Sequence, residues 1–176
     1  MAFVVEPGDG TEPLANSYAS LEEFGEYWTD RGFDYTVFGT GLIQRALIKA
    51  TDYIDLNNKY YFKGQLLKED QPLAFPRENL YIGCRLIEGV PREVKIATFE
   101  YAKRVLEGEG GNGDLFVDPV DRDETGAVIV KQFEKIGPIE TETEYLVGTA
   151  SELRSYPSAD KWLLPFLRGT SGSIRN

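Results

Sequence analysis

The chain has 176 residues, 41% hydrophobic and 12% aromatic, with 29 acidic and 19 basic side chains and a net charge of −10. This composition favours one soluble globular domain over a disordered chain, and no apolar run approaches the roughly 20 residues that a membrane span needs. One cysteine excludes an intrachain disulfide, and the absence of histidine excludes a Ser-His-Asp triad and the usual zinc site, so we expect no enzyme, cofactor or metal.

The N-terminal part predicts an extended arm followed by a first helix. Residues 1–19 contain the turn sequence Pro7–Gly10 and no helical periodicity. The helix is expected to start at Ser20, because its hydroxyl can cap the helix while Glu23 reaches back in a capping box. Gly32 is expected to end it. One face of this helix carries Leu21, Phe24, Tyr27 and Trp28.

Two longer helices are predicted in the middle of the chain. The first covers residues 40–57, where apolar side chains recur at helical spacing. The second starts with Pro91 at its first helical position and ends at Gly108. Residues 58–89 between them predict a long connection with short helical turns. The two buried stripes consist of Ile43, Leu47, Ala50 and Ile54, and of Val94, Ala97, Tyr101 and Val105.

A β-hairpin is predicted at about residues 128–146, after a glycine-rich and acidic surface loop over residues 108–126. Threonines and glutamates alternate in its second half, and Gly137-Pro138 supplies the turn. A two-residue turn would place Lys135 opposite Glu140 and Lys131 opposite Glu144. Because a lone hairpin is marginally stable, it needs a partner surface. The candidate interface residues of the hairpin are Phe133, Lys135, Ile136, Ile139 and Glu140.

The C-terminal part predicts a short helix over residues 156–167, with Pro165 disturbing its last turn. Its apolar side chains would otherwise be underburied, so this segment is a second candidate docking surface. The candidate residues are Trp162, Leu163, Phe166, Leu167 and Arg168. The predicted fold is mainly α: a small helical bundle with a β-hairpin insertion and extended N- and C-terminal arms. It forms a single domain of residues 1–167, followed by a flexible tail of residues 168–176.

Three local patterns are weak signals of chemistry. Gly108–Gly113 matches the glycine spacing of dinucleotide sites, but it follows a helix rather than a strand. Asp121–Gly126 resembles the first half of a calcium loop, but Gln132 takes the place of the bidentate glutamate. Cys84 has no histidine to activate it, so we expect a small buried hydrophobic residue.

An aromatic and basic segment, Tyr60–Lys63, together with Arg77 and Arg85, has the residue types that bind single-stranded nucleic acid. The aromatic rings can stack on bases while the cations neutralise phosphates. The net negative charge opposes such binding. The same residue types also occur in any loop that is tucked under a core, so both interpretations stay open.

Eight segments, taken in order, resemble the tailed-phage proteins of the DnaT-like single-stranded-DNA-binding family. The segments are Ala15–Tyr18, Tyr27–Gly32, Leu47–Asp55, Phe62–Gly64, Leu73–Arg77, Val90–Lys95 with Ala97, Glu134–Ile139 and Tyr156–Pro157. These proteins resemble head–tail connector adaptors. The resemblance implies a structural virion protein, largely helical, that assembles as a ring of twelve copies beneath the portal protein. Double-stranded DNA would pass through this ring without specific binding.

The same resemblance implies roles for the two candidate interfaces. The C-terminal residues Trp162–Arg168 would dock on the portal protein, and the hairpin would contact a neighbouring subunit or a tail or neck protein. The expected location is the head–tail interface of the virion, with the host cytoplasm as the place of assembly and no membrane contact. The family description implies an alternative, a single-stranded-DNA-binding replication accessory protein.

Overall fold

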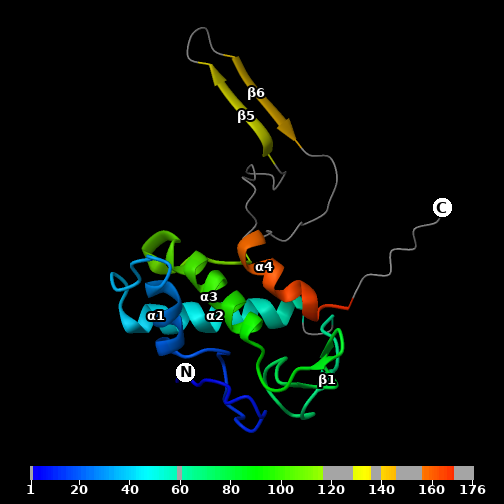
Figure 1. Ribbon diagram of the computed structural model, residues 1–176. Helices are drawn as coiled ribbons and strands as arrows, with labels where there is room; N and C mark the ends of the chain where they lie inside the picture. Colours follow the sequence, from blue (N-terminus) through cyan, green and yellow to red (C-terminus); the bar gives the residue numbers. More distant parts are fainter. Residues whose placement is uncertain (1, 59–60, 117–128, 136–139, 146–155, 169–176) are drawn as a thin grey trace, which may run out of the picture. The chain divides into compact units, whose positions relative to one another are not determined.

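The computed structural model describes residues 2–58, 61–116, 129–135, 140–145 and 156–168 (Figure 1). The chain divides into two compact units. One unit consists of residues 1–115 and 156–176, and the other of residues 116–155. The first unit is helical and the second contains an antiparallel strand pair, so the predicted class, mainly α with a hairpin, is confirmed.

Helix α1 (Leu21–Thr29) begins as its sequence predicts. The Glu23 backbone N–H donates to the Ser20 hydroxyl at 3.2 Å, and the Ser20 N–H donates to the Glu23 carboxylate at 3.0 Å. This reciprocal pair satisfies two backbone donors at the start of the helix. Phe24 and Trp28 on one face of α1 are buried.

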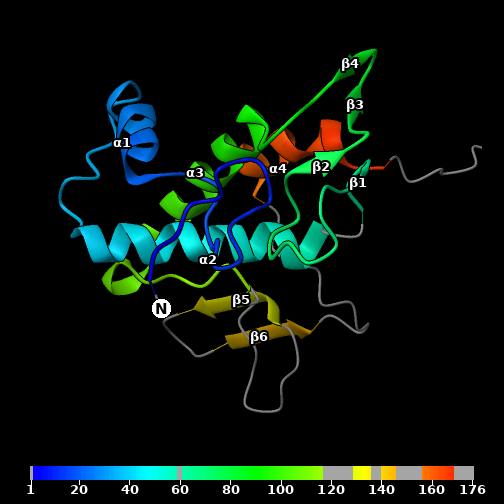
Figure 2. The same cartoon turned by 90° about the horizontal axis from the view of Figure 1, so that it is seen from below.

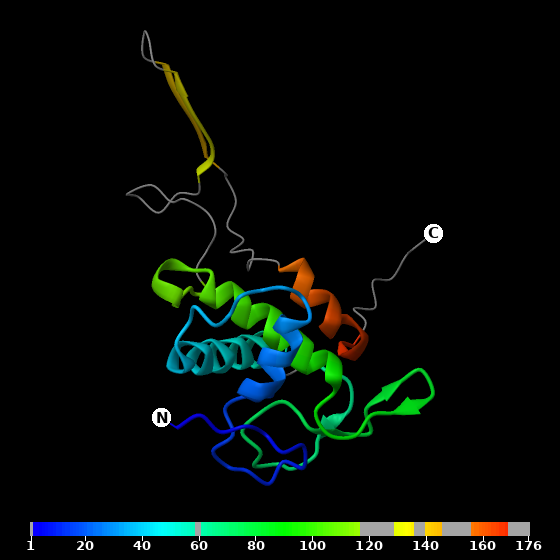
Figure 3. The same cartoon turned by 60° about the vertical axis from the view of Figure 1, so that its left-hand side comes forward.

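The helices α2 (Thr40–Asn58) and α3 (Arg92–Leu106) pack against each other and form the centre of the first unit (Figure 1). Helix α4 (Pro157–Leu163) packs on α3 (Figure 3). It continues into the 3₁₀ turn η2 (Leu164–Phe166), and Pro165 lies in that turn as predicted. Among the described residues, no helix is both long enough and apolar enough to cross a membrane. Both predicted stripes are buried: Ile43, Leu47, Ala50, Ile54, Val94, Ala97, Tyr101 and Val105.

The N-terminal segment packs against the rest of the unit instead of projecting as an arm. Val5 and Ser17 form a parallel bridge, so residues 2–19 fold back on themselves. Tyr18 and Ala19 are completely buried. The turn at residues 7–10 is held by Glu6, whose carboxylate accepts from two backbone N–H groups, those of Gly8 and Gly10.

Four short strands replace the helical turns expected in the connection between α2 and α3. Strand β1 (Gln65–Leu66) pairs with β2 (Arg77–Glu78), and β3 (Tyr81–Ile82) pairs with β4 (Arg85–Leu86), both antiparallel (Figure 2). The expectation of helical turns is wrong because the backbone turns here at positive φ, at Gly64 and Gly83. Such positions end helices and favour tight turns between strands.

The beginning of the predicted acidic loop is packed rather than free. It forms a 3₁₀ turn, η1 (Glu109–Gly111), after α3. The Lys49 ammonium on α2 donates to the Asn112 side chain at 3.1 Å and to the Gly113 carbonyl at 3.1 Å. Leu115 is buried, and its carbonyl accepts from the Tyr156 hydroxyl at 3.4 Å.

The hairpin of the second unit has the predicted register. Strand β5 (Ile129–Lys135) pairs with β6 (Glu140–Tyr145), with Lys135 opposite Glu140 and Lys131 opposite Glu144. The register shifts between Lys131 and Ile129. The predicted turn, Gly137-Pro138, lies outside the described residues.

Candidate nucleic-acid interface

The aromatic and basic segment singled out in the sequence divides into exposed and buried side chains. Tyr61 is 63% exposed, and Lys63 is half-buried. Phe62 is completely buried between them, with its ring 4.8 Å from that of Phe75. Phe62 therefore anchors the segment in the core, and Tyr61 is the ring that can meet a ligand. Tyr60 lies outside the described residues.

The segment is joined to the end of the C-terminal helix. Phe62 and Leu167 form an antiparallel bridge. The Lys63 N–H donates to the Phe166 carbonyl at 2.7 Å, and the Arg168 N–H donates to the Tyr61 carbonyl at 2.7 Å. This bridge places Arg168 opposite Tyr61 and Phe166 opposite Lys63, although more than a hundred positions separate the two segments in the sequence.

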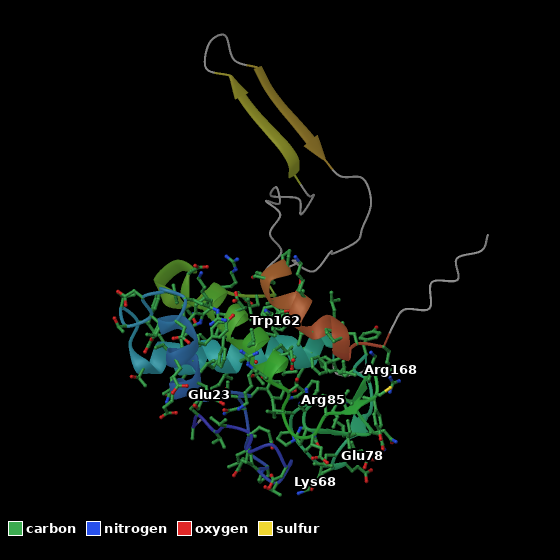
Figure 4. The ribbon with its side chains drawn as sticks, in the orientation of Figure 1. Glu23, Lys68, Glu78, Arg85, Trp162 and Arg168 are labelled. Atoms are coloured by element: carbon green, nitrogen blue, oxygen red, sulfur yellow. The ribbon has the colours of Figure 1, made fainter. Side chains whose placement is uncertain are left out.

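Two arginines converge on the Gly64 carbonyl next to Lys63, and we call Lys63, Arg77 and Arg168 the basic cluster. Arg77 and Arg168 each donate one guanidinium N–H to that carbonyl, at 3.2 and 3.3 Å. The Lys63 ammonium donates to the Pro165 carbonyl at 2.8 Å. Figure 4 labels Arg168 at the same end of the molecule as Glu78, on strand β2.

Arg77 is the buried member of the cluster. It is only 7% exposed, and it also donates to the carbonyls of Lys63 at 2.8 Å and of Ala74 at 3.0 Å. Burial, followed by the neighbouring charge of Arg168, lowers the pKa of the Arg77 guanidinium. Arg77 therefore organises the loop, and Lys63 and Arg168 are the cations that can reach a ligand.

Each hydrogen bond given above for a side chain of the basic cluster is donated to an uncharged backbone carbonyl. Three cations elsewhere do pair with carboxylates: Lys95 pairs with Glu23, and both Lys103 and Arg104 pair with Glu107. Within the described part of the chain, no member of the basic cluster forms an ion pair. A phosphate would therefore meet positive charge that no carboxylate already neutralises.

The structure separates the C-terminal candidate residues into two groups. Leu163 and Phe166 are buried in the chain's own core, and Leu167 is half-buried. Trp162 is 36% exposed, and Arg168 belongs to the basic cluster. No local pattern in the sequence indicated that Arg168 joins Lys63, because the contact depends on the bridge between distant segments.

For the candidate interface residues of the β5–β6 hairpin, the structure describes the position of the backbone alone. Phe133 and Lys135 lie on β5 and Glu140 begins β6, whereas Ile136 and Ile139 lie outside the described residues. Their role as an interface stays a prediction.

The other motifs have separate outcomes. Cys84 is exposed, so the expectation of a buried residue is wrong: it lies in the loop between β3 and β4, away from the core.

Gly108–Gly113 follows α3 and packs near α2, which is not the strand-to-helix setting of a dinucleotide site. Within the described ranges, no three acidic or cysteine side chains gather as a metal site. The calcium-like sequence Asp121–Gly126 falls outside those ranges.

The fold and the surface thus define a mainly α protein with an exposed tyrosine beside unpaired cations. A family model described as "Putative DnaT-like ssDNA binding protein" matches residues 1–176, and the chain belongs to this family. No curated protein and no solved structure matches the chain.

Proposed function

We propose that this protein binds single-stranded DNA through Tyr61 and the exposed cations of the basic cluster, Lys63 and Arg168. The observation that carries the proposal is an exposed aromatic ring beside cations that have carbonyl partners in place of carboxylates. The family to which the chain belongs supports the same ligand.

The chemistry of the surface suits a single strand better than a duplex. A base can stack on the Tyr61 ring only when it is unpaired and splayed from its neighbours, and such stacking contributes about 1–3 kcal/mol per base. Lys63 and Arg168 would then contact the phosphates on either side. This arrangement reads no base edge, so binding should depend little on sequence.

The net charge of −10 does not prevent local binding, although it weakens it. Charges farther away than the Debye length, about 10 Å at 0.1 M salt, are largely screened. The basic cluster acts on a phosphate at contact distance, where screening is small. We therefore expect an affinity that is modest and strongly dependent on salt.

Tyr61→Ala is expected to weaken the binding of an oligothymidylate by about 1–3 kcal/mol, because the stacking surface is lost.

Lys63→Gln and Arg168→Gln are each expected to lower the slope of log affinity against log salt by about 0.7, since each removes one phosphate contact. Fluorescence anisotropy of a labelled oligonucleotide, titrated at several salt concentrations, measures both quantities.

Two further variants serve as controls for that experiment. Arg45→Gln removes an exposed cation on α2 whose guanidinium bonds to its own helix at Gly41, and it should change little. Glu78→Gln removes an exposed acid whose backbone lies against Gly64, and it should strengthen binding. Equal effects of Arg45→Gln and Arg168→Gln, or no binding by the wild type at low salt, would contradict the proposal.

A second candidate function is the ring-forming adaptor at the head–tail interface of a phage virion. Two exposed apolar side chains near the C-terminus favour it: Trp162, and Leu164, which is 61% exposed. Such side chains are suited to a protein partner such as the portal protein. Electron microscopy of the protein mixed with its cognate portal, with the portal alone as control, tests this function. A symmetric ring added to one end of the portal would support it, and no added density would count against it.

A further inference from the structure

The β3–β4 hairpin carries a second exposed aromatic ring. Tyr81 on β3 is 50% exposed. Residues 79–87 contain one charged side chain, Arg85, and the glutamates Glu78 and Glu88 flank them. The hairpin projects from the first unit (Figure 3). It thus carries an exposed aromatic ring that the function proposed above does not use.

A continuous path of contacts connects this hairpin to the basic cluster. Arg168 bonds to the Gly64 carbonyl at 3.3 Å. A Cβ placed on Gly64 would lie 3.2 Å from the Leu80 nitrogen, so the two backbones touch there. Tyr81 follows Leu80 directly. Tyr81 therefore follows the residue whose backbone lies against Gly64, and the Gly64 carbonyl is the group that Arg77 and Arg168 contact.

The hairpin is built to hold Tyr81 in a defined position. Leu80 is completely buried, and its carbonyl accepts from the Ile87 N–H at 2.9 Å, which fixes the base of the hairpin. Tyr81 pairs with Leu86, and Ile82 pairs with Arg85. Because directly opposed residues share a face, Tyr81 and Leu86 lie on one face of the ribbon and Arg85 lies on the other.

The exposed pair of Tyr81 and Leu86 offers an apolar platform on one face of the hairpin. Leu86 is also partly exposed, at 43%. A base that stacks on an aromatic ring buries part of its own face, and neighbouring apolar atoms extend the contact. Because the backbone before Tyr81 lies against Gly64, whose carbonyl Arg168 contacts, the ligand that suits this platform is the next part of the same DNA strand.

We infer that Tyr81 is a second base-stacking platform, and that single-stranded DNA runs from Tyr61 across the basic cluster onto the Tyr81 face of the hairpin. This inference rests on the function proposed above. It assigns the single-stranded DNA two points at which a base stacks on a tyrosine ring, with phosphate contacts between them.

The test compares variants of both platforms in the full-length protein, using an oligothymidylate of about 16 nucleotides, a length that covers known single-strand sites. Tyr81→Ala is expected to weaken binding about 5- to 150-fold, whereas Tyr81→Phe keeps the ring and should bind as the wild type does. Arg85→Gln, on the other face, should have a smaller effect than Tyr81→Ala. Wild-type affinity in Tyr81→Ala, with Tyr61→Ala still impaired, would overturn the inference and leave the proposed function intact.

A measurement on the unaltered sequence guards against misfolding of the variants. Cys84 is the one cysteine of the chain and is exposed in the hairpin loop, so an environment-sensitive dye can be attached to it alone. Addition of the oligothymidylate should change the emission of this dye, with the same concentration dependence as the anisotropy. Binding seen by anisotropy without any change in dye emission would overturn the inference. An absence of binding in both measurements would instead reject the proposed function and this inference together.

Discussion

Gly64→Ala is expected to lower the free energy of unfolding by about 2–4 kcal/mol. Gly64 has φ +73°, a conformation that costs a side chain about 1 kcal/mol or more. A Cβ there would lie 2.5 Å from the Glu78 carbonyl oxygen and 3.3 Å from the Asn79 carbonyl carbon. These atoms belong to the backbone, which cannot rotate away as a side chain can, so β1 and β2 would be forced apart.

Unfolding by urea, followed by circular dichroism, measures this loss. Gly32→Ala is the matched control, because Gly32 has a similar φ of +68° but nothing lies within 4 Å of the position that its Cβ would take. It should lose about 1 kcal/mol, from backbone strain alone. Equal losses in the two variants would show that the contact of Gly64 with residues 78–80 is not tight. Because two arginines bond to the Gly64 carbonyl, Gly64→Ala should also weaken the binding of single-stranded DNA.

Asp55→Ala is expected to destabilise the protein by about 2–5 kcal/mol, since it leaves the buried Tyr18 hydroxyl without the acceptor of its proton and removes one acceptor of the Ala74 N–H. Asp55, on α2, is nearly buried. Its carboxylate accepts from the Tyr18 hydroxyl and from the Ala74 N–H, the latter at 2.8 Å. The Tyr18 oxygen in turn accepts from the Ala74 and Phe75 N–H groups at 3.0 and 3.3 Å. The network fastens the loop before Arg77 to α2.

Thermal and urea unfolding of Asp55→Ala and of a control, Asp52→Ala, test this role. Asp52 lies three residues earlier on the same helix, and its side chain is exposed. Its removal should therefore cost nothing measurable. A similar stability of the two variants would mean that the Asp55 network contributes little.

The same network controls the ionisation of Tyr18. Burial, followed by the charge of Asp55, raises the pKa of the Tyr18 hydroxyl well above 10.0. The neutral hydroxyl is the form that donates to Asp55, so the folded state keeps the proton that the unfolded state begins to lose near pH 10. The stability from this group is thus complete below pH 10 and decreases as the pH rises further.

Local signals in the sequence are sufficient to predict the helices and the register of one hairpin. The Ser20 and Glu23 capping box fixed the start of α1, and regular apolar spacing located α2 and α3. The lysine and glutamate pairs of β5 and β6 identified their register. In each case the determining residues lie within one element or in two neighbouring ones, where spacing alone sets which side chains meet.

The candidate site depends on contacts that no local pattern encodes. Arg168 lies opposite Tyr61 and reaches the Gly64 carbonyl only because Phe62 pairs with Leu167. The short strands β1–β4 were missed because two-residue strands carry no periodicity, and Cys84 was misplaced because its exposure follows from the turn between β3 and β4. Tyr61 could be chosen as a candidate by residue type, but its exposure, and the burial of Phe62 beside it, required the packed core.

The hydrogen bond from the Tyr156 hydroxyl to the Leu115 carbonyl joins the two chain positions between which residues 116–155 are inserted. Leu115 and Tyr156 are the two points at which the helical unit is interrupted by residues 116–155, and they lie within reach of one tyrosine side chain. Segments inserted between adjacent chain ends can change in length or content without straining the host. We therefore expect that the helical unit can carry inserts of different size at this position while its own fold and its basic cluster stay the same.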